Sequence, residues 1–160
     1  MSNSTSSPVI TSEQLLKHWQ GHRSLTRRVI EAFPEKDLFN YSIGGMRTFS
    51  QLVMEFVGMA TPTLIGITTR KWPEGGTTEA PTTKAEMLEL WDKTTGEIDR
   101  LWPGISADRF QETDKAFGQW EMPIYGLVSY IIDNEIHHRG QGYVYLRSLG
   151  VEPPPFYVRE

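Results

Sequence analysis

The longest helical pattern in the chain spans residues 123–150, PIYGLVSYIIDNEIHHRGQGYVYLRSLG. Pro123 suits the first turn of a helix and Gly150 suits a helix C-terminus, so the sequence predicts one helix between them. Several side chains recur along it at spacings of three, four or seven residues, which places them on one side of the helix. They are Leu127, Ile131, Asn134, His138, Tyr145 and Leu149. Asn134 and His138 therefore interrupt an otherwise apolar stripe.

Two segments in the first half of the chain also have helical periodicity. Residues 11–33 start with a capping-box pattern and stop at Pro34, which predicts a first helix. Residues 48–67 are strongly apolar and predict a second helix that kinks or ends around Pro62. Residues 35–45 contain Asn and Gly residues, and we expect them to form a loop.

The second half of the chain contains one more predicted helix before residue 123. Residues 71–81 concentrate Pro, Gly and Thr and should form an exposed connection. Residues 83–101 begin with another capping-box pattern and predict a third helix, ending near Pro103. Residues 106–121 are polar and without clear periodicity, and we expect their aromatic side chains to anchor them to the bundle. These are Phe110, Phe117 and Trp120.

These segments define the expected fold class. Four helices and no strand-rich region predict an all-α four-helix bundle formed by a single domain, residues 1–160. Residues 1–10 should be a frayed N-terminus. Residues 151–160 contain three prolines and cannot continue the helix, so this tail should lie extended on the surface or reach a partner chain.

Composition narrows the range of functions. The chain has 160 residues and a formal net charge of −4 without a Lys/Arg run, so we expect no nucleic-acid partner. It contains no cysteine, which excludes a thiolate nucleophile and cysteine-ligated metal sites and fits the reducing cytoplasm. No signal peptide is apparent, and no segment approaches the roughly 20 apolar residues of a membrane span. We therefore expect a cytoplasmic protein without a membrane partner.

Three polar residues on predicted core faces are candidates for chemistry. Asn134 and His138 lie one helical turn apart and can converge on a single cation, although the pair taken alone is explained more simply by a hydrogen-bonded Asn and His in the core. Glu55 is the only charged residue between Arg47 and Arg70. A buried carboxylate must be paired, protonated or bound to a cation, and an internal ion pair, for example with Arg139, is the alternative to a metal.

Other polar residues nearby have less direct interpretations. His18 and His22 stand four apart, and His22 is either a further contributor to the site or half of a partly buried pair without metal. His137 lies one position from His138 on the last helix, so its side chain is expected at the rim of the site rather than at its centre. Arg139 is expected to pair with Asp133 or Glu135, or to orient an anionic substrate. Two glycines in the same helix suggest close approach by a neighbouring helix or chain. They are Gly140 and Gly142.

The stretch Asn134-Glu135-Ile136-His137-His138-Arg139-Gly140-Gln141 resembles the C-terminal signature of the DinB/YfiT-like superfamily. The resemblance continues through Tyr145-Leu146-Arg147, Leu149-Gly150 and Pro153-Pro154. It implies a DinB/YfiT-like four-helix bundle, often dimeric, that holds a divalent cation with three side chains from two helices. In most members these ligands are three histidines.

Carried over by position, the ligands implied by this resemblance are Glu55, Asn134 and His138. Only His138 keeps the usual residue of the family. The resulting carboxylate, amide and imidazole are a harder and weaker ligand set than three imidazoles, yet they suit Zn, Ni, Fe or Mn with open positions for water. His22 or His137 could compensate for a missing imidazole, or the site could have lost its cation.

The resemblance also implies a range of activities on small molecules. Some relatives are transferases or isomerases that use low-molecular-weight thiols, and others are metal-dependent hydrolases. We therefore expect a metal-dependent, thiol-dependent transferase that acts on a small-molecule substrate. The alternatives are a metal-dependent hydrolase and a non-catalytic small-molecule sensor with a degenerate metal site. The helix glycines and the Pro-rich tail further predict a homodimer.

Overall fold

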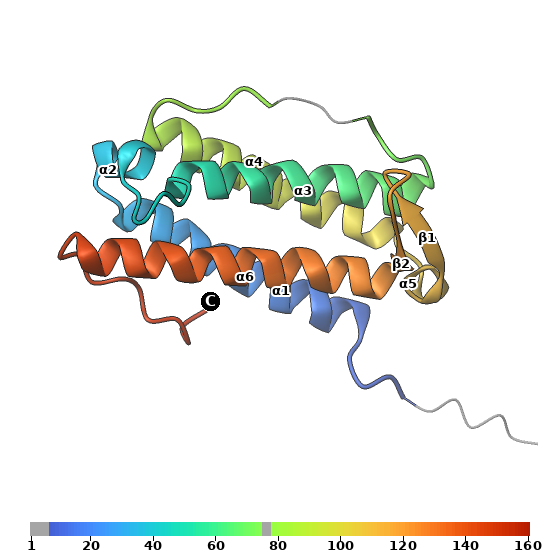
Figure 1. Ribbon diagram of the computed structural model, residues 1–160. Coiled ribbons are helices and arrows are strands. Elements are labelled where there is room, and N and C mark those ends of the chain that lie inside the picture. The colour runs from blue at the N-terminus through green and yellow to red at the C-terminus, as the bar shows by residue number, and fades with distance from the viewer. Residues whose placement is uncertain (1–6, 75–77) are drawn as a thin grey trace, which may run out of the picture.

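The computed structural model describes residues 7–74 and 78–160, which contain four long helices (Figure 1). They are α1 (Ser12–Ala32), α3 (Phe49–Thr69), α4 (Lys84–Leu101) and α6 (Ile124–Ser148). Both α1 and α3 pack against α4 and α6, so the four helices form a closed ring. The predicted all-α four-helix bundle is confirmed.

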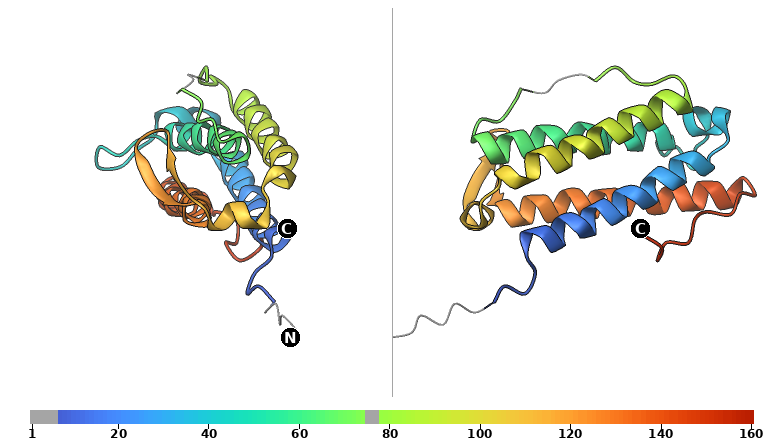
Figure 2. Two further views of the ribbon diagram at one scale, coloured as in Figure 1. Left: turned by 90° about the vertical axis from the view of Figure 1, so that its right-hand side faces the viewer. Right: turned by 180° about the vertical axis from the view of Figure 1, so that it is seen from behind.

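The helices form two parallel pairs that run antiparallel to each other. α1 and α6 run in one direction and α3 and α4 in the other, because the connection from α3 to α4 returns along the length of the bundle (Figure 1). The view along the bundle shows the four helices around a common interior (Figure 2). Apolar side chains fill this interior from Trp19 and Ile131 near one end to Phe49 and Tyr145 near the other. As a result, side chains of α3 and α6 face each other along much of their length.

Side-chain caps fix the starts of three helices. The two capping boxes expected from the sequence are present, formed by Thr11 at the start of α1 and by Thr83 at the start of α4. A third box begins α3, where the Thr48 side chain accepts from the backbone N–H of Gln51. Each box satisfies backbone donors that a helix N-terminus otherwise leaves free. The start of α3 matters for function because Arg47 immediately precedes its cap.

One expectation about helix boundaries is wrong, and of the two alternatives at Pro62, a kink or an end, the end is excluded. Residues 35–45 are not all loop, because Glu35–Asn40 form the short helix α2 with Leu38 buried beneath it. α3 does not end at Pro62 but continues to Thr69. Burial of Leu64 and Ile67 after the proline stabilises the helix, and Gly58, one turn before the proline, is exposed so that its freed carbonyl can meet water.

The unassigned stretch after α4 forms small elements at one end of the bundle. These are the 3-10 turn η1 (Trp102–Gly104), helix α5 (Ala107–Gln111) and the antiparallel strands β1 (Thr113–Ala116) and β2 (Trp120–Pro123). Phe117 and Gly118 have positive φ at the hairpin turn. Phe110 is a buried anchor as expected, whereas Trp120 is 53% exposed. The hairpin therefore stands partly away from the core.

The two ends of the chain behave differently. Residues 7–10 are exposed and precede α1, while residues 1–6 of the expected frayed N-terminus lie outside the described residues. The C-terminal tail, residues 151–160, lies extended against its own chain. Tyr143 of α6 donates to the carbonyl of Pro154 at 2.7 Å, and Ser24 of α1 donates to that of Glu160 at 2.9 Å.

The apolar helix α3 corrects one further expectation. Phe49–Thr69 is long and apolar enough to cross a membrane by length and composition, and a stretch of 18 residues within it has a mean hydropathy of 1.4. Half of this stretch is buried inside the protein. The position of α3 against α4 and α6 accounts for its apolar composition, since a central bundle helix buries more than one face.

Candidate metal centre

The structure brings together all three residues of the predicted ligand set. Glu55 comes from α3, and Asn134 and His138 come from successive turns of α6, which packs against α3. Nδ2 of Asn134 donates to Oε1 of Glu55 at 2.9 Å, and Nε2 of His138 lies 3.5 Å from the same oxygen. The i, i+4 spacing places both α6 side chains opposite one carboxylate. Their role as metal ligands remains a prediction.

The carboxylate of Glu55 has a second partner that the sequence did not reveal. Arg47, in the loop before α3, donates from its guanidinium to Oε2 of Glu55. The internal ion pair considered for Glu55 is therefore present, but its partner is Arg47 and the suggestion of Arg139 is wrong. Partial burial raises the pKa of Glu55, but hydrogen bonds from Asn134 and Arg47, together with the positive charge of Arg47, outweigh it and lower the pKa. Glu55 is thus a carboxylate at neutral pH.

His138 is held in a defined orientation. Its Nδ1 lies 3.3 Å from Oε1 of Gln141, and its ring stacks on Phe56 with centroids 6.1 Å apart. Because an amide oxygen accepts, this contact favours the tautomer with the proton on Nδ1. The lone pair of Nε2 then faces the carboxylate of Glu55. Two acceptors that face each other need a proton or a cation between them.

The amide of Asn134 provides an independent indication of a missing partner. Its Oδ1 is buried and has no hydrogen-bond partner in the structure. A buried amide oxygen without a donor is unfavourable, and such groups mark positions where an ion or water is bound. The described residues contain no cluster of three or more His, Asp or Glu side chains suited to a metal, so the candidate set depends on this amide.

The observed separation of the ligand atoms suits a metal centre. Two ligands about 2.1 Å from a zinc ion, at the tetrahedral angle, lie roughly 3.4 Å apart. The distance between Nε2 of His138 and Oε1 of Glu55 is 3.5 Å. The donor set of carboxylate, amide oxygen and imidazole also suits Mn, Fe and Ni. The types of donor present and the separation between His138 and Glu55 therefore fit a divalent cation, with Gln141 as the group that orients the histidine.

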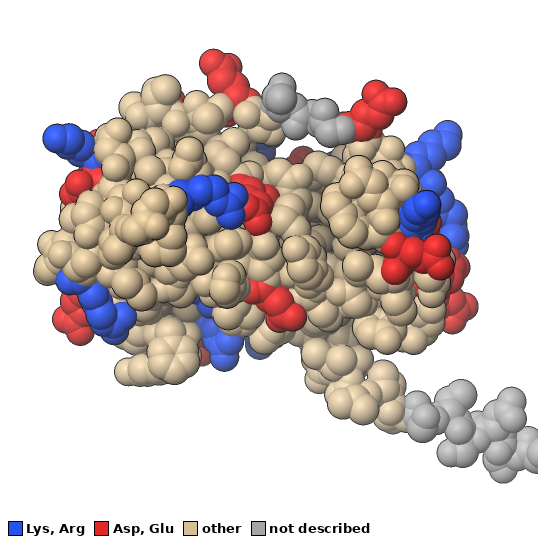
Figure 3. Space-filling model, viewed as in Figure 1, with Lys and Arg blue, Asp and Glu red and all other residues tan. Residues whose placement is uncertain are grey.

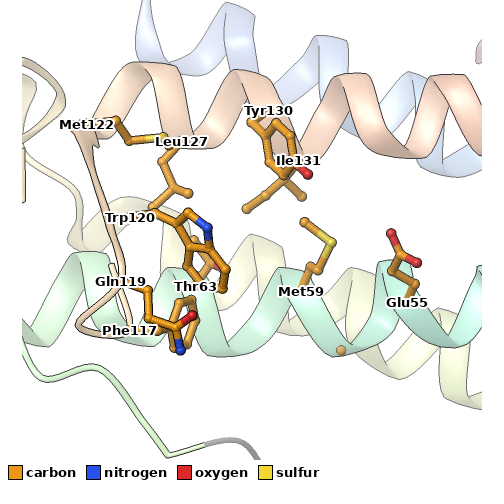
Figure 4. A pocket seen from close by; sticks show the side chains of 11 residues that line it. Glu55, Met59, Thr63, Phe117, Gln119, Trp120, Met122, Leu127, Tyr130 and Ile131 are labelled. Carbon is orange, nitrogen blue, oxygen red and sulfur yellow. The ribbon is translucent and has the colours of Figure 1, made fainter. Parts of the chain in front are cut away.

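A large cavity adjoins the site. It has a volume of about 690 Å³ and runs between α3 and α6 towards the β1–β2 hairpin. Glu55 lies at one end, and Phe117 and Trp120 of the hairpin lie at the other (Figure 4). Most of the wall between them is apolar, formed in part by Met59 and Ile131 (Figure 4). A small molecule in this cavity can place one end against Glu55 while its apolar part is shielded from water.

The remaining histidines lie outside the three-residue cluster. His137 is exposed, as expected for a rim position, and its ring centroid is 4.9 Å from that of His138. His22 is buried and its ring lies edge-on to His18, with centroids 4.6 Å apart. The structure gives it Arg139 and Arg159 as partners, each 3.0 Å from one ring nitrogen. His22 therefore belongs to the interface between α1, α6 and the tail.

A second polar network surrounds Glu135, which is 1% exposed. Thr26 donates to its Oε1 at 2.6 Å, and the guanidinium groups of Arg23 and Arg139 lie 3.8 and 3.9 Å from its two oxygens. Of the partners considered for Arg139, the structure thus selects Glu135. This network lies between α1 and α6, whereas the adjacent residue Asn134 faces α3.

Two functional features of the site lacked a sequence signal. Arg47 lies eight residues before Glu55, so their contact depends on the path of the loop that precedes α3. The contribution of the hairpin to the cavity depends on the fold of residues 106–121, whose sequence has no clear helical or strand periodicity. The contact between Gln141 and His138 could have been predicted from the sequence, since the two residues are three apart and such neighbours share a helix face.

Comparisons with known proteins agree with this architecture. The DinB family model matches residues 1–160, which is the full length of the chain. The search of curated proteins found no match.

Two solved structures share the fold. A DinB-like protein from Bacillus cereus ATCC 10987 has a TM-score of 0.72 and 21% sequence identity, and the match covers 91% of this chain and 97% of that one. The DinB-like protein YjoA from Bacillus subtilis has a TM-score of 0.75 and 20% identity, covering 92% and 99%. The full-length family match, the four-helix bundle and these two likenesses together show that the chain belongs to the DinB family.

Proposed function

We propose that the protein is a metal-dependent enzyme, a transferase that joins a low-molecular-weight thiol to a small apolar electrophile. One observation carries the proposal. A carboxylate, an amide and an imidazole from two helices converge, and the carboxylate, that of Glu55, lies at one end of an apolar cavity of about 690 Å³. A carboxylate with a shifted pKa at the end of an apolar pocket is a common arrangement in active sites.

In this proposal Glu55, Asn134 and His138 hold a divalent cation. When bound, the cation supplies Lewis acidity, which lowers the pKa of a thiol or a water molecule so that it becomes a nucleophile at neutral pH. Glu55 contributes the negative charge that attracts the cation. Gln141 keeps the proton of His138 on Nδ1, which leaves Nε2 free to bind.

The cavity selects and orients the electrophile. Met59 and Ile131 present apolar surface beside Glu55, and Trp120 lines the far end (Figure 4). Binding apolar surface there aligns the reacting carbon with the polar end of the cavity and excludes water from it. His137, exposed and beside His138, is positioned to exchange a proton with solvent.

Metal content and thiol dependence test the proposal together. Protein purified without a His-tag or chelator should contain about one transition metal per chain, and added metal should raise its melting temperature. Glu55→Gln should abolish both effects. Asp133→Asn, which removes an exposed carboxylate one residue from Asn134, should retain them. Failure of the wild-type protein to bind metal or to gain stability would refute the proposal.

Activity assays separate the alternative functions. A panel of small electrophiles and activated esters should be turned over only with both metal and thiol present. Turnover that ignores the thiol would favour a metal-dependent hydrolase. Ligand binding that persists in a metal-free His138→Ala variant, without turnover, would favour a small-molecule sensor with a degenerate site.

The setting of the protein is also part of the proposal. We expect a cytoplasmic homodimer, supported by exposed apolar side chains on α6 such as Tyr130 and Val144, with exposed Gly140 between them. A strictly monomeric mass by light scattering at high concentration would contradict this. We expect no nucleic-acid ligand, because the net charge is −4 and acidic and basic side chains are interspersed on the face in Figure 3.

A further inference from the structure

The carboxylate at the candidate metal centre already has a cation beside it. Arg47 donates to Oε2 of Glu55, while Asn134 donates to Oε1. Both carboxylate oxygens therefore have donors, and the guanidinium neutralises the charge that a divalent ion needs. A metal at Glu55 must either displace Arg47 or bind beside a like charge. Both routes weaken metal binding.

The position of Arg47 lets its side chain leave without unfolding its surroundings. The side chain is 48% exposed, and the salt bridge to Glu55 is the ion pair that the structure gives it. Its backbone stays in place, because Tyr145 donates to the Arg47 carbonyl at 2.9 Å and the capped helix α3 begins directly after it. The interactions that hold the backbone of Arg47 are thus independent of the ion pair between its guanidinium and Glu55.

We propose that Arg47 is a displaceable counter-cation that competes with the divalent metal for Glu55 and thereby sets the affinity of the centre. This inference rests on the proposed function, since it concerns the same site. The guanidinium of Arg47 pairs with the carboxylate of Glu55 when no metal is bound, and it moves into solvent when a metal binds. The half-buried carboxylate is thereby paired in both states, with Arg47 in one and with the metal in the other.

A purely structural role for Arg47 predicts something different. Half-exposed ion pairs contribute little to folding, and their loss changes nothing beyond stability. Under that interpretation, Arg47→Gln would slightly lower the melting temperature and leave metal affinity unchanged. Competition instead predicts that the same variant binds metal more tightly.

Calorimetric titration of the tag-free, metal-stripped protein with Zn²⁺, Ni²⁺ or Mn²⁺ tests the competition. Arg47→Gln should bind about tenfold more tightly than the wild type, since it removes a competing charge within a few ångströms of the metal. Arg47→Lys keeps the charge and should stay within about threefold of the wild type. The matched control is Arg100→Gln, which breaks the surface pair with Glu97 and should bind like the wild type.

Each outcome decides the inference, and melting curves of the same samples establish that every variant is folded. Equal or weaker binding by Arg47→Gln, with a wild type that binds metal, overturns the competition and leaves the proposed function standing. Binding by Arg47→Gln alone supports the competition and refutes a metal-dependent function of the wild type. Absence of binding in both proteins overturns both ideas.

Discussion

Replacing Glu135 with alanine should destabilise the protein severely without affecting the candidate metal centre. The carboxylate is 1% exposed, accepts from Thr26 at 2.6 Å and from Trp19 at 3.4 Å, and lies within 4 Å of Arg23 and Arg139. Removing one member of a buried ion pair typically costs 3–5 kcal/mol, because the remaining charge stays buried without compensation. Here two guanidinium groups would lose their shared carboxylate.

Remaining contacts reduce that cost. Arg139 also donates to the carbonyl of His22, and Arg23 also donates to the carbonyl of Trp91 and lies 3.5 Å from the centroid of its ring. Burial lowers the pKa of Arg23 to about 10, and the charge of Glu135 opposes this decrease. We therefore expect a loss at the lower end of the range, about 3 kcal/mol. In a domain of this size, that loss corresponds to a decrease in melting temperature of roughly 6–12 °C.

Urea denaturation followed by circular dichroism measures the change. Glu135→Ala should lose about 3 kcal/mol, while Asp133→Asn, at an exposed position on the same helix, should change by less than about 0.5 kcal/mol. Metal binding by the folded fraction should match that of the wild type, since Glu135 faces α1 rather than α3. A loss below about 1 kcal/mol for Glu135→Ala would refute this account of the buried network.

Two further predictions concern pH and helix packing. Burial and, next, the charge of Arg139 lower the pKa of His22 to about 3, so between pH 6.5 and 3 only the unfolded state binds that proton and stability falls as pH falls. His22→Gln should therefore lose stability less steeply on acidification, by at most about 1.4 kcal/mol per pH unit, and identical slopes in denaturation series would contradict this. Gly142→Ala should cost about 1–3 kcal/mol, because its Cβ would lie 2.5 Å from Cε2 of buried Phe49. In Gly140→Ala the new Cβ meets no atom within 4 Å, so this variant should gain roughly 0.5–1 kcal/mol of folding stability. Equal effects of the two substitutions in thermal melts would disprove the close packing of Gly142 against Phe49.

Much of the bundle followed from periodicity and caps, because these signals act within one helix. The long helices and the boxes at Thr11 and Thr83 were predictable on that basis. The continuation of α3 through Pro62 was not, since tertiary burial on both sides of the proline overrides the local signal for a break. Residues 106–121 could not be assigned for a related reason, because their short hairpin is stabilised by its place at the end of the bundle.

The candidate site was predictable only to the level of helix faces. The spacing of Asn134 and His138 placed them on one stripe, and the isolated charge of Glu55 marked α3 as its partner. The ion-pair partners of the charged side chains were harder to predict, because a pair between two helices or between a helix and a loop depends on the path of the loop and the rotation of the helix. The pairing proposed between Glu55 and Arg139 was therefore wrong, and Arg47 was missed.

Gly142 illustrates a correct inference with an open alternative. The sequence suggested close approach by a neighbouring helix or chain, and the structure identifies the neighbour as Phe49 of the same chain. This removes Gly142 from the argument for dimerisation and leaves exposed Gly140 in it.

The central claim is that one divalent cation joins Glu55, Asn134 and His138. Anomalous diffraction from crystals grown with Zn²⁺ or Mn²⁺ tests it most directly. The account predicts a single strong peak about 2.0–2.3 Å from a carboxylate oxygen of Glu55, Oδ1 of Asn134 and Nε2 of His138, and no such peak in His138→Ala crystals. A map with no anomalous density between these three side chains, while Arg47 still holds Glu55 at millimolar metal, would contradict it.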